Sequence, residues 1–162
     1  MDHPIVQAAK EAFKARVMGG CDVSTHTRNA QAIAKAWRAA AFDLDPSRYQ
    51  YEVPVRPEFD QRIDVLDRQE MCAFEFKVSG KNATSEFYKD VVKILLWNER
   101  HEDKIEKLVF ITEETFGRRL LDSPMPRAFI AFLQSHHLAV EIAYVGAAEI
   151  ALVPTRGETN DN

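Results

Sequence analysis

Two short apolar segments joined by a polar turn constrain the fold of this chain more than any other stretch. Residues 62–66 and 71–78 both alternate in the manner of β-strands. Because successive strand residues point to opposite faces, Glu75 and Lys77 share one face, whereas Phe74, Phe76 and Val78 share the other. The pattern predicts a β-hairpin with two charges above an apolar underside.

The length of the turn decides where Asp64 lies. An even number of turn residues, for example Gln69 and Glu70, places Asp64 on the face of Glu75, opposite or diagonal to it. A turn of three residues would bury Asp64 on the other face instead. The alternative for the whole pattern is an ordinary hairpin with a surface Glu–Lys pair, since this spacing arises often by chance.

Two carboxylates and one ammonium group on one rim suit a hard divalent cation. Mg²⁺ prefers carboxylate oxygens, takes one or two of them from the protein and keeps several waters. Such an ion supplies a nucleophilic water and offsets the charge that develops on a phosphate group during its hydrolysis. The residues therefore favour phosphodiester hydrolysis.

The spacing of these residues also resembles the core motif of a known family. Asp64, a gap of ten residues and then Glu75-Phe76-Lys77 within an apolar strand is similar to the motif of the PD-(D/E)XK nuclease superfamily, which has the restriction-endonuclease-like fold. Ile63 stands where the family name has proline. The resemblance implies an α/β fold with an αβββαβ core, in which helices flank a mixed central sheet.

The same resemblance implies a role for each motif residue. Asp64, Glu75 and the backbone carbonyl of Phe76 are expected to bind Mg²⁺, for which Mn²⁺ can substitute, and Lys77 is expected to orient or activate the attacking water. Members of the family often add a polar residue from a preceding helix. The candidates for this auxiliary position are Glu11 and Gln31, and Glu52 is a third candidate because it faces away from Tyr51 on its strand.

A basic residue after the motif strand is a further family feature. Four residues are candidates for binding nucleic acid, two in the loop and two on the helix that follow the strand: Ser79, Lys81, Lys89 and Lys93. The alternative for the two helical lysines is that they are solvated and paired with Glu86 and Asp90.

The remaining periodicity predicts one domain over residues 1–154 and a loose polar tail over residues 155–162. Helices are expected at residues 4–17 and 27–41, and the core at 47–146 begins with a strand in which Pro54 indicates a sheet edge or a bulge. A helix at 85–100 is expected to bury Phe87, Val91, Ile94 and Leu95. A buried strand at 107–112, helices at 115–121 and 126–137, and a strand at 138–145 complete the core, with Phe129, Phe132 and Leu133 buried.

Composition excludes several classes of function. The 162 residues carry 21 Lys and Arg against 25 Asp and Glu, a net charge of −4, which argues against a uniformly basic nucleic-acid binder but not against a local phosphate site. The two cysteines are too few for a disulfide framework, and the sequence contains no P-loop, Gly-x-Ser-x-Gly or Gly-x-Gly-x-x-Gly motif, so no nucleotide cofactor is expected. Without an evident signal peptide or membrane span, a cytoplasmic protein is expected.

These observations lead to a first hypothesis of a Mg²⁺-dependent endonuclease that acts on DNA, in the class of metal-dependent phosphodiesterases. A homodimer is compatible with it, since small nucleases of this family often cut both strands as dimers. The alternative is a catalytically silent member of the same fold that binds nucleic acid or a protein partner. A third hypothesis is an unrelated α/β domain with these charges on its surface.

Overall fold

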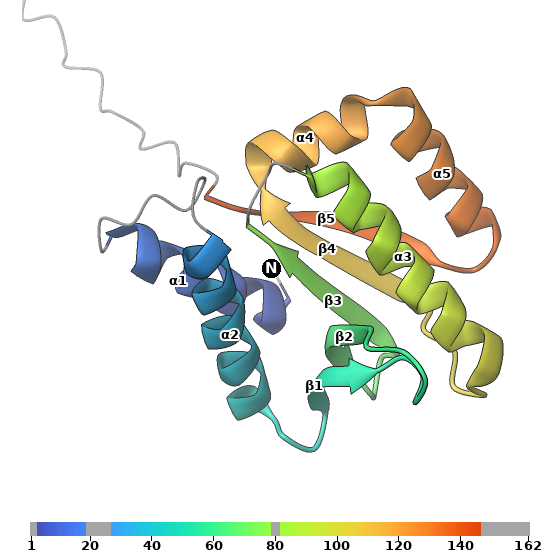
Figure 1. The fold of residues 1–162 in the computed structure, drawn as a ribbon, viewed down its shortest axis with the longest axis horizontal. Helices are drawn as coiled ribbons and strands as arrows, with labels where there is room; N and C mark the ends of the chain where they lie inside the picture. Colours follow the sequence, from blue (N-terminus) through green and yellow to red (C-terminus); the bar gives the residue numbers. More distant parts are fainter. Residues whose placement is uncertain (1–2, 19–26, 79–81, 147–162) are drawn as a thin grey trace, which may run out of the picture.

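Five strands form one mixed sheet in which the strand order is the chain order, β1-β2-β3-β4-β5 (Figure 1). The computed structural model describes residues 3–18, 27–78 and 82–146. The first three strands pair antiparallel: β1 (Tyr49–Pro54), β2 (Arg62–Asp67) and β3 (Cys72–Lys77). The last three pair in parallel, since β4 (Lys107–Glu113) lies between β3 and β5 (Ala139–Val145).

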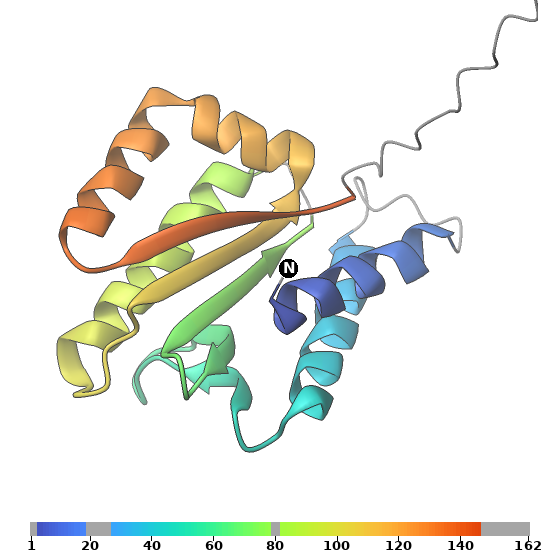
Figure 2. The same ribbon diagram turned by 180° about the vertical axis from the view of Figure 1, so that it is seen from behind.

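Helices cover both faces of the sheet, as the two opposite views show (Figures 1 and 2). One face is covered by α1 (Pro4–Met18) and α2 (Thr27–Leu44). The other is covered by α3 (Ala83–Arg100), α4 (Glu114–Asp122) and α5 (Pro124–Ser135). Parallel neighbours require crossover connections, and here α3 makes the first crossover while α4 and α5 make the second. The α/β class expected from the sequence is confirmed.

Alternation along the central strands builds two hydrophobic cores. On β3, Phe74 and Phe76 pack toward α1 and α2, whereas Ala73 packs toward α3. On β4, Val109 belongs to the first core and Phe110 to the second, so both faces of β4 are covered as expected. The sheet is thus the shared wall of both cores.

The register of the β2–β3 hairpin settles the position of Asp64. Asp67 pairs with Cys72, so four residues, 68–71, form the turn, and Leu66 pairs with Ala73. Extending this antiparallel register by two residues sets Asp64 opposite Glu75. The even turn therefore puts both carboxylates on one face, which is the outcome that the hairpin pattern left open.

Strand β1 lies at the edge of the sheet and ends at Pro54, as its proline predicted. Its ladder with β2 pairs Tyr51 with Val65 and Val53 with Ile63. Between them Glu52 has a φ of 49°, a left-handed conformation that residues other than glycine rarely adopt. This local distortion lies directly across the ladder from Asp64.

Two expected burial patterns are wrong. Leu95 of α3 is 41% exposed, because the buried stripe continues from Ile94 to Trp97 rather than to the next residue. Phe132 of α5 is 54% exposed, although Leu133 beside it is fully buried. Both errors come from the rotation of a helix about its axis, which periodicity alone fixes only approximately.

Other expectations concern cysteine and the C-terminal tail. Cys72 is a free buried thiol, and burial raises its pKa to about 12, so it stays protonated at neutral pH. The polar tail expected at residues 155–162 lies outside the described residues.

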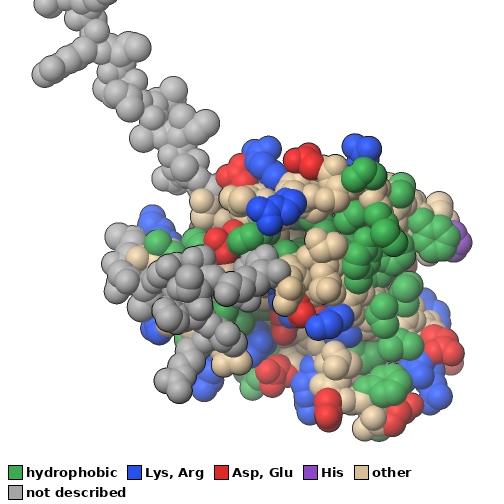
Figure 3. Space-filling model, turned by 45° about the horizontal axis from the view of Figure 1, so that its top comes forward, with side chains coloured by type: hydrophobic (Ala, Val, Ile, Leu, Met, Phe, Trp, Pro, Cys, Tyr) green, Lys and Arg blue, Asp and Glu red, His purple; other side chains and the backbone are tan. Residues whose placement is uncertain are grey.

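The surface carries both charge signs. On the face drawn in Figure 3, Lys and Arg side chains are interspersed with Asp and Glu side chains, and hydrophobic side chains gather on the right of that view. On the helical layer formed by α3, α4 and α5, the exposed hydrophobic residues include Val92, Leu95, Met125 and Phe132. Among the described residues, no helix has the length and hydropathy needed to cross a membrane.

Candidate active site

The hairpin brings the three motif residues together. Lys77 Nζ lies 3.9 Å from Asp64 Oδ2 and 3.7 Å from Glu75 Oε2. Two backbone contacts fix the carboxylates: the N–H of Asp64 donates to Glu75 Oε1 at 3.3 Å, and the N–H of Phe76 donates to Asp64 Oδ2 at 3.2 Å. At the end of β3, the Lys77 carbonyl accepts a hydrogen bond from Thr112 Oγ1 of β4 at 2.8 Å. The site is thus built on paired strands.

Helix α3 contributes two further charged residues, Asp90 and Lys93. Lys93 Nζ lies 2.6 Å from Glu75 Oε1 and 2.7 Å from Asp90 Oδ1, and it donates to the Arg62 carbonyl at 2.9 Å. An ammonium group has three hydrogens, so these three acceptors saturate it. Lys93 thereby ties α3 to both strands of the hairpin.

Two buried carboxylate oxygens of this cluster have no hydrogen-bond donor. Glu75 and Asp90 are 0% and 2% exposed, and Glu75 Oε2 and Asp90 Oδ2 have no hydrogen-bond partner in the structure. Both oxygens lie 3.7 Å from Lys77 Nζ, which is too far for a hydrogen bond. Buried polar atoms nearly always form hydrogen bonds, so two buried oxygens that accept none have lone pairs free to bind a cation. The donor set, hard carboxylate oxygens, fits Mg²⁺.

Burial and mutual repulsion shift the pKa values of this cluster. Burial, together with the neighbouring Asp90 and Asp64, raises the pKa of Glu75 well above its usual value, and burial likewise raises the pKa of Asp90. Burial alone would lower the pKa of Lys77, but Asp90, Glu75 and Asp64 around it raise that pKa overall. Lys77 is therefore an ammonium group at neutral pH and donates hydrogen bonds rather than accepting a proton.

A third cation reaches the site from the opposite helical layer. Arg38 of α2 donates from Nη1 to Asp64 Oδ1 at 3.3 Å, and its Nη2 lies 3.2 Å from Glu52 Oε1. Of the three auxiliary candidates, Glu52 is thus the one that the structure connects to the motif, through Arg38. Arg38 was not among the residues that the sequence singled out.

The other predicted residues lie elsewhere. Glu11 is hydrogen-bonded to Gln7 on the exposed side of α1, and Gln31 is an exposed residue of α2, seven positions before Arg38. Lys89 is exposed and pairs with Glu86 at 2.8 Å. Lys93 is not an exposed phosphate contact, because it is 6% exposed and held by carboxylates. Ser79 and Lys81 lie outside the described residues.

Asp90 is the acidic residue of the site that sequence reasoning missed, as it missed Arg38. Asp90 was considered only as a surface partner of a lysine. Phe87, Asp90 and Ile94 are spaced by three and four positions, so Asp90 falls within the buried stripe of α3. A charged residue at a core-facing helical position indicates a partner inside the protein, and that indication was present in the sequence.

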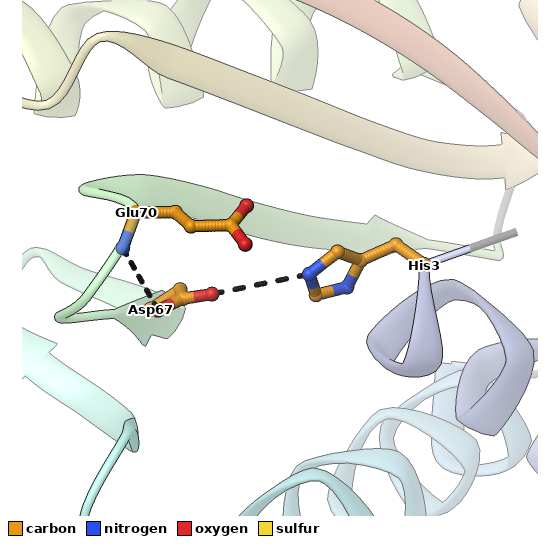
Figure 4. A group of neighbouring side chains, drawn as sticks. All are labelled: His3, Asp67 and Glu70. Carbon is orange, nitrogen blue, oxygen red and sulfur yellow. Dashed lines mark hydrogen bonds and ion pairs between the residues drawn. The ribbon is translucent and has the colours of Figure 1, made fainter.

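A second acidic cluster lies at the hairpin turn, where His3 at the start of α1 points toward Asp67 and Glu70 (Figure 4). Among the described residues, this is the one group of three possible ligands whose atoms all lie within 4.8 Å of one another. The carboxylates around Lys77 are spread more widely. Nevertheless, Asp67 Oδ2 already accepts two hydrogen bonds from Arg48, at 2.9 and 2.6 Å.

The protonation of His3 also argues against a metal at this cluster. The N–H of Ile5 donates to His3 Nδ1 at 3.2 Å, so the neutral ring carries its proton on Nε2, the atom that faces Asp67 at 3.9 Å. A protonated Nε2 cannot ligate a metal. The cluster instead clamps the start of α1 to the turn between β2 and β3.

Comparisons of the chain with family models, curated proteins and solved structures gave no match. The geometry of the cluster around Lys77 is therefore the basis for assigning a function.

Proposed function

We propose that this protein is a Mg²⁺-dependent endonuclease, which hydrolyses internal phosphodiester bonds of DNA. The observation that carries the proposal is the pair of buried oxygens, Glu75 Oε2 and Asp90 Oδ2, that lack hydrogen-bond donors beside Lys77. Asp64 completes the group from the neighbouring strand. Lys77 and Lys93 offset the repulsion among these three acidic side chains, and a bound Mg²⁺ would add to that compensation at the two oxygens that no donor reaches.

The order of elements supports the assignment to the restriction-endonuclease-like fold. From α2 to β4 the chain runs α-β-β-β-α-β, with the carboxylates on the second and third of these strands. This is the order that the motif resemblance implies. Fold alone does not establish activity, so the proposal rests on the site.

Each residue of the site has a distinct role in the proposed hydrolysis. Asp64, Glu75 and Asp90 would hold Mg²⁺, together with the Phe76 carbonyl, and the bound ion would polarise the phosphate and acidify water. Lys77, whose side chain is 24% exposed, donates hydrogen bonds to the attacking water or to a phosphate oxygen. Lys93 positions Glu75 and Asp90 without touching the substrate. Water adds across one P–O bond, leaving a phosphate on one fragment and a hydroxyl on the other.

The test is cleavage of supercoiled plasmid, linear duplex and branched DNA by the purified protein with Mg²⁺, Mn²⁺ or EDTA. We expect metal-dependent cutting that is abolished in Asp64→Asn. Lys77→Ala should lower the rate by about 10²–10³-fold, the typical effect of removing one electrostatic donor at a reacting group. Lys89→Ala is the matched control, because Lys89 is an exposed lysine of α3 whose ammonium group pairs with Glu86 and not with the carboxylate cluster.

Two results would count against the nuclease. Equal cutting by wild type and Asp64→Asn would show that the activity comes from elsewhere. No cutting of any substrate, together with no Mg²⁺ binding by calorimetry on folded protein, would remove the metal site itself.

The second candidate is a catalytically silent module of the same fold that binds nucleic acid or a protein. It is favoured by the charge balance of the site, in which Arg38, Lys77 and Lys93 stand against three carboxylates, so that the cluster is neutral without a metal. Folded protein that binds DNA equally well in Mg²⁺ and in EDTA, without cutting it, would support this alternative.

A further inference from the structure

A groove with a volume of about 300 Å³ lies between α2 and β1, next to the candidate active site. Its aromatic wall consists of Phe42 from α2 and Tyr51 from β1, whose rings meet edge to face with centroids 5.3 Å apart. Two cationic and two acidic side chains, Lys35, Arg38, Asp43 and Glu52, form its polar border. The groove thus combines an aromatic surface with charged groups of both signs, of which Lys35 and Arg38 are the cationic ones.

Tyr51 offers much of its ring to solvent. The residue is 50% exposed, although it lies on a strand of the central sheet. Phe42 contacts it at an interplanar angle of 78°, so the contact is edge to face and not a stack. An exposed aromatic ring in a concave site is suited to stacking with another planar ring.

Arg38 connects the groove to the carboxylate cluster. The same guanidinium group that lines the groove contacts both Asp64 and Glu52, at 3.3 and 3.2 Å. Arg62, the first residue of β2, donates to the Glu52 carbonyl at 3.0 Å, which places one more cation at this border. A DNA backbone that runs from Asp64 into the groove would therefore pass the guanidinium groups of Arg38 and Arg62.

We infer that this groove binds one unpaired nucleotide of the DNA strand whose phosphodiester lies at Asp64 and Glu75, with the base stacked on Tyr51. The inference rests on the proposed nuclease function and adds to it a class of substrate. A base has an exposed π-face only when it is unstacked from its neighbours, so the preferred DNA contains a single-stranded segment or a frayed end.

Stacking explains the groove better than base-edge readout. Every base has a π-face, so an aromatic platform flanked by cations binds single strands without a sequence requirement. Lys35 and Arg38 suit the phosphates on either side of that base, and the planar guanidinium of Arg38 can itself pack against a base.

The experiment measures binding without cleavage. A fluorescein-labelled duplex carrying a single-stranded tail of four thymidines is titrated in EDTA, and fluorescence anisotropy compares it with the same duplex having blunt ends. Wild type is expected to prefer the tailed duplex. Tyr51→Ala should weaken binding of the tailed duplex by about tenfold or more, a magnitude typical of one stacked base.

Two variants control for structural effects. Tyr51→Phe keeps the ring and should bind the tailed duplex as wild type does. Phe132→Ala removes an equally exposed aromatic from α5, which covers the far side of the sheet, and should leave binding unchanged. Urea unfolding of each variant confirms that it is folded.

The inference is overturned if Tyr51→Ala binds the tailed duplex as tightly as wild type does, or if it loses affinity equally for blunt duplex. Failure of the nuclease proposal gives a different result. A protein that never cuts DNA but loses its preference for tails in Tyr51→Ala retains the stacking site. A protein that cuts DNA with Mg²⁺ but shows no preference for tails retains the nuclease proposal and refutes the stacking site.

Discussion

Lys93 is the residue whose structural role can be tested most directly. Its ammonium group contacts Glu75 on β3, Asp90 on its own helix and the Arg62 carbonyl on β2. A buried ion pair is a weak source of net stability, but the loss of one partner leaves the other charge buried and unpaired. Lys93 is therefore needed for the fold as well as for the proposed site.

We expect Lys93→Met to lower the free energy of unfolding by about 3–5 kcal/mol at neutral pH, because the variant leaves Glu75 and Asp90 without their closest cation. The measurement is urea denaturation followed by circular dichroism. The loss should be smaller at acidic pH, since Glu75 has a raised pKa and can take up a proton there.

Lys89→Met is the matched control for this prediction. Lys89 lies one turn earlier on α3, is 66% exposed at its side chain and pairs with Glu86. Surface ion pairs contribute little, so its loss should change stability by about 0.5 kcal/mol or less. Equal effects of the two substitutions would contradict the role assigned to Lys93.

For single residues, the sequence predicted the site residues that lie on strands but not those that lie on helices. Asp64, Glu75 and Lys77 follow from strand alternation, which has a period of two and allows only two faces. Asp90 and Arg38 depend on the rotation of a helix about its axis, and a shift of one residue turns a side chain by about 100°. The face of a helix is thus harder to assign than the face of a strand.

Among the elements, α1 is attached to the sheet by a clamp at its first turn. The His3 ring caps the helix through Nδ1, packs 4.7 Å from the Phe74 ring, and turns Nε2 toward Asp67. Burial lowers the pKa of His3, even though Glu70 and Asp67 act in the opposite direction. The clamp is therefore formed by the neutral ring.

Acidification should loosen this clamp. A histidine whose pKa is lower in the folded state than in the unfolded state contributes stability above pH 6.5, its ordinary pKa, and loses that contribution as pH falls through the lowered value. We expect the unfolding free energy of wild type to fall more between pH 7 and pH 5 than that of His3→Gln. Urea titrations at several pH values measure this difference.

The comparison isolates His3 because the other titrating groups are present in both proteins. The raised pKa of Glu75 acts with the opposite sign and cancels in the difference. Asp67 takes up its proton only below the pH range of the experiment. Burial opposes its ionisation, but hydrogen bonds from Arg48 and the turn N–H groups hold its pKa below 3.8. Parallel curves for the two proteins would contradict the clamp.

Most element boundaries were predicted closely because proline, glycine and polar clusters mark them in the sequence. Pro54 was consistent with the edge position of β1, and the unbroken apolar run at residues 107–112 predicted that β4 is covered on both faces. The groove beside Tyr51 could not be predicted, since it depends on the distance between α2 and β1, which no local pattern encodes.

For the whole molecule, the two cores should unfold together. Strands β3 and β4 supply side chains to both, for example Phe74 and Val109 on one face and Ala73 and Phe110 on the other. Each core also contains one of the two tryptophans, Trp37 of α2 in the first and Trp97 of α3 in the second. Fluorescence can therefore report on each core separately.

We expect the variants Trp97→Phe and Trp37→Phe each to show one urea transition with the same midpoint by fluorescence and by circular dichroism. Each variant retains one tryptophan, so each fluorescence curve follows one core. Coincident curves are the mark of a two-state domain. A Trp37 signal that changes at lower urea than the circular dichroism would show that the α1–α2 layer unfolds on its own.

The identity of strand order and chain order has a consequence for biosynthesis. Each strand pairs with the one before it, so a chain emerging from the ribosome always offers the next strand an adjacent free edge. All residues of the carboxylate cluster, from Arg38 to Lys93, precede β4 in the chain. Until β4 is made, however, β3 is the edge strand of the nascent sheet. Its backbone edge is then unpaired, although β3 is an apolar strand that contains Phe74 and Phe76 and is buried in the finished fold. We therefore expect the nascent chain to be prone to aggregation after β3 has been made and before β4 pairs with it.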